Sequence, residues 1–559
     1  MPKADVAAGF EAALGQAQDA LRRGAWREGR AKFENALTLE DAPEAYDGLA
    51  TCCRFLGVLD ESLAARERAY RLYRDRGDLA GATIAAAWLG RDSALPRGET
   101  SVARSWFAVA RRQLAKTSSA LARGTLRYYE GQFALLGEFD APKAGDLGGE
   151  ARAAGRECGD LDLEMQGLSL QGVALVAEGR VAEGMARVEE ATAAVLGGEL
   201  SGADVAGWIC CHLIYACERV SDTRRAAEWC STLRGFCERW DMPGMFGMCR
   251  AHHGTVLMHE GRWADAEAEF IEASQLFATA APALGYEAVV RLCALRLRQG
   301  RFDEVIALAD LLEGTPLGWL ALPSRAAVAA EQGDLTVAQE LLDRYDRTVT
   351  DRDRMLRVEV LELATRIHLE RGELDDATRA VAALGALVPA EPGTERLRGT
   401  AALVRGRVLA ARHELAEARI AFEDATELFA QSGAPFDLAR ARAARGDVLI
   451  ELGDIERGKS ELIAAREAFS ALGADGEMRR AEDALARTNR RPTSGRWTLS
   501  ERELDVLRLA ADGLSNAEIA ARLGLSAHTV NRHMANIRTK LGGDSKAAVV
   551  ARATREGWI

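Results

Sequence analysis

A short turn of the form Gly-x-hydrophobic-acidic recurs along most of this chain of 559 residues, and neighbouring copies lie 33 to 42 residues apart. Ala, Leu, Arg and Glu dominate between the turns, and all four favour helix. Proline is scarce at 12 residues, and strand-like alternation is almost absent. The period therefore predicts an all-α chain in which each unit is a helix, a tight turn and a second helix. The turns are GAWREG at 24, GVLDES at 57, GRVAEG at 179, GRWADA at 261, GRFDEV at 300, GDLTVA at 333, GELDDA at 372, HELAEA at 413 and GDIERG at 453, with weaker members near Gly98, Gly137 and Ser221.

The side chain five residues after each anchor is mostly small. A small residue at this place lets the second helix of a unit cross closely over the first. Units of this length and form predict a stacked α-solenoid. The small residues are Gly29, Ser62, Gly184, Ala266, Ala338, Ala377, Ala418 and Gly458.

The units resemble degenerate tetratricopeptide repeats, although no single unit carries the full pattern of that repeat. We expect about twelve helix hairpins over residues 1–487. The resemblance implies a long concave groove that holds a peptide, a protein or a ligand. The alternative is an array that serves only as a scaffold or an oligomerisation surface.

Capping signals mark helix starts in the last part of the chain, residues 497–559. Ser500 is followed three residues later by Glu503, and Ser515 by Glu518. In such a box the serine and glutamate side chains satisfy backbone amide groups at a helix N-terminus. Two short helices are therefore expected to begin after these serines.

Two further helices are predicted in the same stretch. Ser526 is expected to open a third helix, and Asp544 or Ser545 a fourth. Only the residues 523–525 separate the second helix from the third, and Gly524 among them can adopt the positive φ that a tight turn needs. This connection predicts a helix-turn-helix.

The third helix has an apolar face and a polar face. Apolar residues at helical spacing should pack this helix against its neighbours. Asn and Arg on the other face are the side chains that form paired hydrogen bonds with adenine and guanine edges. Thr, Arg and Lys suit phosphate oxygens. The predicted core is Ile519, Leu523, Val530, Met534 and Ile537, the predicted base-reading residues are Asn531, Arg532 and Ala535, and the predicted phosphate or positioning residues are Ser526, Thr529, His533, Arg538 and Lys540.

The C-terminal stretch resembles the LuxR/FixJ-type DNA-binding domain over essentially the whole of that domain. The matching segments are LSERELDVL at 499–507, GLSNAEIAARLGLS at 513–526, TVNRHMANIRTKL at 529–541 and the closing GWI at 557–559. The resemblance implies that the third helix reads the major groove and that the fourth supports dimerisation. Asn531 stands where the family usually has Lys, and Lys546 where it usually has Arg. Asn531 in place of a cation suggests an altered base preference.

Charge separates the two parts of the chain. Residues 493–559 hold ten Lys and Arg against seven Asp and Glu, which gives about +3. The whole chain carries −12, so the part before residue 493 carries about −15. A phosphate backbone attracts the basic module and repels the acidic part. A charge of about +3 is modest, so we expect two copies on DNA, reading half-sites roughly 34–36 Å apart.

A predicted linker, residues 488–496, separates the repeat array from the C-terminal domain. It contains Pro492, Ser494 and Gly495, which break helices, and a group of arginines. This composition suits a solvated tether.

Residues 453–460 spell GDIERGKS and match the phosphate-binding P-loop pattern. That motif requires a preceding strand and a nucleotide-binding sheet. Here the segment coincides with a repeat turn, in which Gly453 is the anchor and Gly458 the small crossing residue. We therefore expect a structural turn and no nucleotide site.

Residues 210–259 are rich in cysteine and histidine, which are common ligands of soft metal ions. The sequence leaves three interpretations open: plain helical core, a pocket for an organic effector, or a metal or thiol sensor. No CxxC spacing supports the last of these. The stretch holds Cys210, Cys211, Cys217, Cys230, Cys237, Cys249, His212, His252, His253 and His259.

The sequence predicts a cytoplasmic bacterial transcription regulator that binds double-stranded DNA as a homodimer. Its repeats would sense a protein or small-molecule effector whose identity the sequence does not give. The N-terminus lacks a signal-peptide pattern, and no apolar run is long enough for a membrane helix. No catalytic constellation, cofactor or metal is expected. The alternative function is a repeat-based interaction scaffold whose terminal module acts as a tether.

Overall fold

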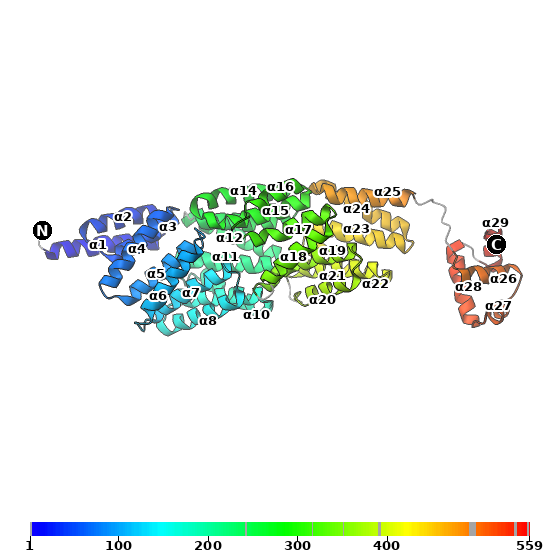
Figure 1. Cartoon of the computed structure of the whole chain (residues 1–559), viewed down its shortest axis with the longest axis horizontal. Coiled ribbons are helices and arrows are strands. Elements are labelled where there is room, and N and C mark those ends of the chain that lie inside the picture. The colour runs from blue at the N-terminus through cyan, green and yellow to red at the C-terminus, as the bar shows by residue number, and fades with distance from the viewer. Residues whose placement is uncertain are drawn as a thin grey trace. The chain divides into compact units, whose positions relative to one another are not determined.

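The computed structural model describes residues 3–240, 243–315, 317–349, 352–389, 393–490, 499–541, 545–555 and 558–559. Within these ranges the secondary structure consists of helices and their connecting turns, which confirms the all-α prediction. None of the helices in this part of the chain is long and apolar enough to cross a bilayer. The chain divides into two compact units, Met1–Leu485 and Ala486–Ile559, and Figure 1 labels most of their helices.

The first unit is a stack of antiparallel helix hairpins, as the repeat predicts. Twelve pairs in the described residues run from α1/α2 to α23/α24, and α25 follows them. Three short 3₁₀ helices interrupt the later connections, namely η1 (Pro282–Gly285), η2 (Gly318–Ala321) and η3 (Arg354–Leu356). The helices are α1 (Lys3–Arg22), α2 (Trp26–Leu39), α3 (Pro43–Phe55), α4 (Leu59–Asp75), α5 (Leu79–Ala94), α6 (Thr100–Leu114), α7 (Ala120–Leu136), α8 (Ala141–Cys158), α9 (Leu161–Ala177), α10 (Val181–Leu196), α11 (Ala203–Val220), α12 (Thr223–Trp240), α13 (Pro243–His259), α14 (Trp263–Ala280), α15 (Tyr286–Gln299), α16 (Phe302–Asp310), α17 (Leu322–Glu331), α18 (Leu335–Val349), α19 (Arg357–Glu370), α20 (Leu374–Gly385), α21 (Glu395–Ala411), α22 (Leu415–Gln431), α23 (Pro435–Glu451), α24 (Ile455–Leu472) and α25 (Asp475–Arg490).

Each recurring turn lies between the two helices of one hairpin. The anchor residue adopts a left-handed conformation, for example Gly179 with φ 88° and Gly453 with φ 93°. His413 and Ser221, which replace glycine in two of the turns, both have φ 60°. Near Gly137 the left-handed residue is Phe139, with φ 55°, two positions later than the sequence suggests. A positive φ reverses the chain tightly enough for the second helix to pack back on the first.

Glycine pairs bring some helices of a hairpin into backbone contact. A Cβ atom on Gly184 of α10 would lie 2.5 Å from the carbonyl oxygen of Gly172 of α9. A Cβ atom on Gly458 of α24 would lie 2.7 Å from the carbonyl oxygen of Gly446 of α23. Even an alanine would clash at these two crossings, which explains why the residue five positions after the anchor is glycine in these two units.

The odd-numbered helices form an inner layer, because most of them also contact the next odd-numbered helix. Distant hairpins meet across this layer. Arg219 of α11 forms an ion pair with Asp353, just before η3, with Nε and Oδ2 3.0 Å apart. The backbone amide of Ala283 donates to the carbonyl oxygen of Pro96 over 2.9 Å. These two contacts join hairpins that are distant in sequence.

The second unit contains four short helices around one apolar core. Leu499, near its start, packs with the last two residues of the chain, Trp558 and Ile559. The described helices are α26 (Glu501–Ala511), α27 (Asn516–Leu523), α28 (Ala527–Leu541) and α29 (Lys546–Arg555).

Helix α25 continues to Arg490, three residues into the segment predicted as a linker. Residues 488–490 contain no helix-breaking residue, so the helix has no local reason to stop before them. Pro492, Ser494 and Gly495 lie outside the described residues, as does Trp497.

Candidate nucleic-acid interface

Two complete capping boxes start the first two helices of the C-terminal module. The hydroxyl of Ser500 accepts from the amide of Glu503 over 3.2 Å, and the Glu503 carboxylate accepts from the amide of Ser500 over 2.9 Å. Ser515 and Glu518 form the same reciprocal pair. Because both helices are short, these local hydrogen bonds contribute a large share of what defines their starts.

The turn between α27 and α28 has the expected geometry. Gly524 is left-handed with φ 67° and ends α27. The hydroxyl of Ser526 accepts from the amide of Thr529 over 3.1 Å and so caps α28. The hydroxyl of Ser545 accepts from the amide of Ala548 and opens α29. Asp544, the alternative cap for α29, lies outside the described residues.

Helix α28 buries its apolar face. Val530, Met534 and Ile537 are at most 1% exposed. Ile519 of α27 is also buried, and Leu523 is half-buried against the same cluster. These five residues are the predicted core, and they meet in one place. Their packing fixes which face of α28 turns outward.

The three predicted base-reading residues lie on the outward face of α28, where Asn531, Arg532 and Ala535 are exposed. The oxygen Oδ1 of Asn531 accepts a hydrogen bond from Nδ2 of Asn516 over 2.7 Å. Sequence reasoning did not identify Asn516, because it lies on another helix and no local pattern indicates the contact.

Lys546 orients this pair of amides. Its ammonium group donates to the carbonyl oxygen of Leu514 and lies 3.4 Å from Oδ1 of Asn516. An ammonium group only donates, so the oxygen of Asn516 must face Lys546 and its NH₂ group must face Asn531. The NH₂ group of Asn531 therefore points away from this network.

The predicted positioning residues occupy different environments. Ser526 and Arg538 are exposed, and Thr529 is half-buried beside Ser526, with their hydroxyl oxygens 2.8 Å apart. His533 is half-buried, and its Nδ1 is buried without a hydrogen-bond partner among the described residues. Lys540 is half-buried and forms an ion pair with Glu503.

The ion pair of Lys540 links α28 to the start of α26. Its Nζ lies 2.6 Å from Oε2 of Glu503. Burial alone would raise the pKa of Glu503, but the hydrogen bonds from Lys540 and from the Ser500 amide lower that pKa below its ordinary value. Lys540 thus has a partner inside the module, and a phosphate contact would have to compete with this partner.

Comparison with known proteins assigns this module. Residues 497–553 match the GerE family, described as "Bacterial regulatory proteins, luxR family". The C-terminal module is a LuxR-family helix-turn-helix domain. The transcriptional activator protein PhzR of Pseudomonas fluorescens is 43% identical over 60 residues, which cover 11% of this chain and 25% of that protein.

An HTH-type transcriptional regulator of Mycobacterium tuberculosis is 27% identical over 249 residues, which are 43% of this chain. The matched part spans only 23% of the length of that relative. Among solved structures, a chain of the APC/C hetero-tetramer Cut9–Hcn1 aligns over 85% of this chain and 95% of its own length, with a TM-score of 0.39 and 14% identity.

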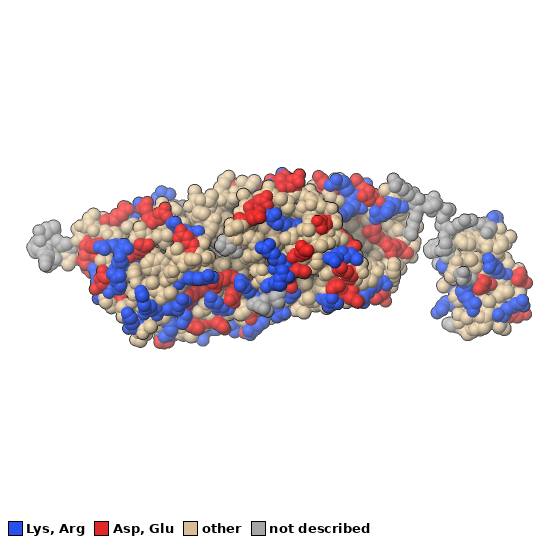
Figure 2. All heavy atoms as spheres, viewed as in Figure 1, with Lys and Arg blue, Asp and Glu red and all other residues tan. Residues whose placement is uncertain are grey.

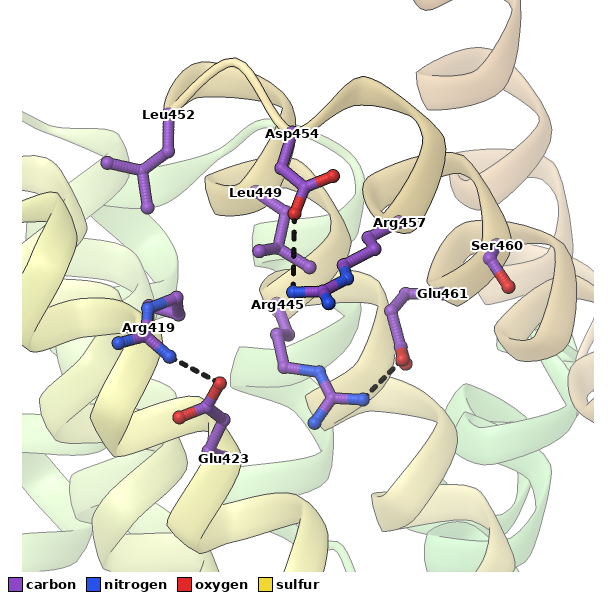
Figure 3. Close-up of a pocket in the computed structure, with 9 residues that line it drawn as sticks. All are labelled: Arg419, Glu423, Arg445, Leu449, Leu452, Asp454, Arg457, Ser460 and Glu461. Atoms are coloured by element: carbon purple, nitrogen blue, oxygen red, sulfur yellow. Dashed lines mark hydrogen bonds and ion pairs between the residues drawn. The ribbon is translucent and has the colours of Figure 1, made fainter.

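The P-loop-like segment forms the turn between α23 and α24, as expected from its place in the repeat. No strand occurs near it in the described chain, and Ile455 already begins α24. A surface pocket of about 540 Å³ lies beside this turn and is lined by Asp454, Arg457 and Ser460 (Figure 3). Arg457 pairs with Asp454 at 3.6 Å, so its charge is already matched.

The six cysteines of residues 210–259 pack as core, as do His212 and His252, whereas His253 and His259 are half-buried. The six cysteines of this stretch are buried and free of disulfides. Burial raises the pKa of the Cys249 thiol to about 11 and that of Cys210 to about 12, which keeps both protonated. Burial also lowers the pKa of His212 to about 4, and its Nδ1 lies 2.6 Å from the hydroxyl of Ser169. These properties favour the core interpretation over the metal or thiol sensor.

One group of potential metal ligands is found among the described residues, at the turn between α19 and α20. It consists of His368, Glu373 and Asp376, whose ligand atoms lie within 4.8 Å of one another. Glu373 also pairs with Arg371 at 2.8 Å, and Asp376 pairs with Arg379. Both carboxylates are thus already neutralised, which weakens the case for a cation here.

Proposed function

We propose that this chain is a DNA-binding transcription regulator whose α28 enters the major groove of promoter DNA. One observation carries the proposal. The packing of Val530, Met534 and Ile537 leaves Asn531 and Arg532 exposed together on the opposite face of α28. A helix that presents Asn and Arg from a rigid helix-turn-helix suits direct readout of base edges. The similarity to transcription regulators supports the same conclusion.

Arg532 is proposed to donate two hydrogen bonds to a guanine, and Ala535 to lie against a base edge. Asn531 offers its NH₂ group, since Asn516 occupies its oxygen. In this state it suits an acceptor such as guanine N7 or thymine O4. Ser526, Thr529, His533, Arg538 and Lys540 are the proposed phosphate or positioning residues.

We further propose that residues 1–487 form the sensing part, 488–496 the linker and 497–559 the DNA-binding part. The boundary of the compact units, at Leu485 and Ala486, supports this division. Two copies would bind a pair of half-sites, and an effector at the repeats would control them. The chain would act in the cytoplasm of a bacterium, where its DNA target lies.

Selection of bound fragments from random or genomic DNA tests the proposal. The full chain is expected to enrich a sequence with two-fold symmetry and to bind it at least 10³-fold more tightly than random DNA at physiological salt. A salt-dependent affinity without sequence preference would instead favour the scaffold whose terminal module is only a tether.

A further inference from the structure

Charge alone gives the C-terminal module little means of choosing a DNA sequence. On the face shown in Figure 2, its basic side chains are interspersed with acidic ones. Contacts with phosphates add affinity for any DNA, whereas hydrogen bonds with base edges carry sequence information. Sequence preference therefore depends on polar groups whose donors and acceptors are fixed in direction.

A short chain of hydrogen bonds connects α29, α27 and α28. Nζ of Lys546 in α29 donates to the backbone oxygen of Leu514 and lies 3.4 Å from Oδ1 of Asn516, the first residue of α27. Nδ2 of Asn516 donates in turn to Oδ1 of Asn531 in α28 over 2.7 Å. Each step joins one donor to one acceptor, so the chain has a direction, which runs from Lys546 to Asn531.

Lys546 is the member of this chain that cannot be reversed. The amides of Asn516 and Asn531 each carry a donor group and an acceptor oxygen, so either amide could serve in both directions, whereas an ammonium group only donates. Lys546 and Asn516 are both half-buried. Glu518 is close enough to interact with the charge of Lys546, but its carboxylate already accepts from the Ser515 amide over 2.7 Å. The ammonium group of Lys546 therefore sets the direction of both amides.

The free end of the chain is the NH₂ group of Asn531, on the exposed face of α28. In the major groove, guanine presents the acceptors N7 and O6 and thymine presents O4, whereas cytosine presents the donor N4. A side chain that only donates matches guanine or thymine and meets cytosine donor to donor. The two-bond contact with adenine is also excluded, because it needs the oxygen of Asn531 as well as the NH₂ group.

We propose that Lys546 determines the base preference of the module from outside the reading helix. It fixes the direction of the hydrogen bonds through Asn516, so that Asn531 reads a base edge that accepts. Lys546 is thus a positioning residue and touches no base itself. This role rests on the proposed reading of DNA by α28, and it adds the class of base edge that α28 selects and the residue that sets this class.

The alternative role for a lysine in such a module is contact with a DNA phosphate. A phosphate contact would strengthen binding to all sequences about equally and would add about one unit to the slope of the salt dependence. A positioning lysine would change the preference at one base pair and leave the salt dependence as it is. Base preference and salt dependence therefore separate the two roles.

Affinities of the full chain for its selected DNA site and for single-base variants of that site test this role. Asn531→Ala first identifies the base pair whose preference depends on Asn531. At this pair the wild type is expected to bind guanine or thymine more tightly than cytosine. The measured quantity in every variant is the ratio of the affinities for guanine and cytosine at this pair.

Asn516→Asp should invert the preference with almost no change of shape. Its carboxylate only accepts, so it accepts from Lys546 and from the NH₂ group of Asn531, and the oxygen of Asn531 then faces the base. The ratio of guanine to cytosine affinity should fall about tenfold or more, the effect of exchanging one or two hydrogen bonds. An aspartate in the first turn of α27 is favourable to that helix, so the variant should fold.

Substitutions of Lys546 itself separate its charge from its hydrogen bonds. Lys546→Met keeps the aliphatic stem and removes the donor, so the ratio should approach one while the salt dependence stays unchanged. Lys546→Arg should keep the wild-type ratio, because a guanidinium group also only donates. Arg555→Gln is the matched control, since it removes an exposed positive charge from the same helix and should leave the ratio unchanged.

Two results would overturn the role of Lys546. One is the same ratio in the wild type and in Asn516→Asp. The other is a Lys546→Met protein that binds all sequences more weakly, with a reduced salt dependence and an unchanged ratio, as a phosphate contact requires. A wild-type chain that prefers no DNA sequence would instead contradict the proposed function on which this role rests.

Discussion

In the repeat unit, small residues allow the two helices of a hairpin to pack closely. In the C-terminal module, serine residues cap the helix N-termini, and the four helices share one apolar core. Although α5, α7, α8 and α9 begin with a single side-chain cap, no helix of the unit has a full capping box among the described residues. α10, α14 and α22 begin without any side-chain cap, and their hairpins depend on close crossings and left-handed turns. α26 and α27 each begin with a full capping box. A long array can distribute its stability over many interfaces, while a module of four short helices depends on each local signal.

The largest loss of stability is expected from a substitution in the apolar core of the C-terminal module. Met534 is 1% exposed, so Met534→Ala should destabilise the module by about 2–5 kcal/mol. Hydrogen exchange of the full chain should then show lost protection in α26–α29 and unchanged protection in α9 and α10. The exposed Arg538→Ala serves as the control and should change stability by less than about 0.5 kcal/mol. Equal loss of protection in the repeats would mean that the two units are not separate.

Glycine-to-alanine substitutions at two positions of the repeats compare a close helix crossing with an open helix surface. Gly184→Ala places a Cβ atom 2.5 Å from a backbone oxygen and should destabilise the unit by about 1–3 kcal/mol. A Cβ atom on Gly235 of α12 would have no other atom within 4 Å, so Gly235→Ala should stabilise its helix by up to about 1 kcal/mol. Urea unfolding of both variants checks the signs. A stable Gly184→Ala protein would contradict the close-crossing explanation.

Arg532→Ala should cost roughly 1–3 kcal/mol of discrimination at one base pair, because a guanine would lose a two-bond contact. Binding to a panel of single-base variants of the selected site measures this. Arg508→Ala removes an exposed charge from α26 and should weaken binding without changing the preferred sequence. An unchanged preference in Arg532→Ala would remove this residue from the reading set.

The smallest predicted effect is a change in base preference, and it comes from the hydrogen bond between Asn516 and Asn531. Asn516→Ala frees the oxygen of Asn531, which then can accept from adenine N6 while its NH₂ group donates to N7. We expect adenine to gain about 0.5–1.5 kcal/mol at the base pair that Asn531 reads. Competition binding with base substitutions at that position is the measurement. The same base preference before and after the change would show that Asn516 does not restrain Asn531.

The sequence predicted the architecture and the two faces of α28 because both depend on local patterns. The anchors and the capping boxes each lie within a few residues, and the alternation of Val530, Met534 and Ile537 with exposed positions is a helical period. It did not predict the shift from Gly137 to Phe139, where glycine is not the left-handed residue.

Contacts between residues that are distant in the chain could not be predicted from the sequence, for a physical reason. The pair of Arg219 and Asp353 spans 134 residues, and many arginines and carboxylates could have formed it. The partners of Asn531 and Lys540 lie on other helices, so only the packing of the module reveals them.

Contacts between hairpins that are distant in sequence also constrain how this protein can evolve. The hydrogen bond from Ala283 to Pro96 is one of them. In an ordinary solenoid, a duplication or deletion of one hairpin lengthens or shortens the array and leaves every remaining neighbour intact. In this array, the gain or loss of one hairpin between two distant hairpins would shift them relative to each other. Residues that are now in contact would then be separated. Change by single substitutions is therefore expected to be easier for this array than change in the number of its repeats.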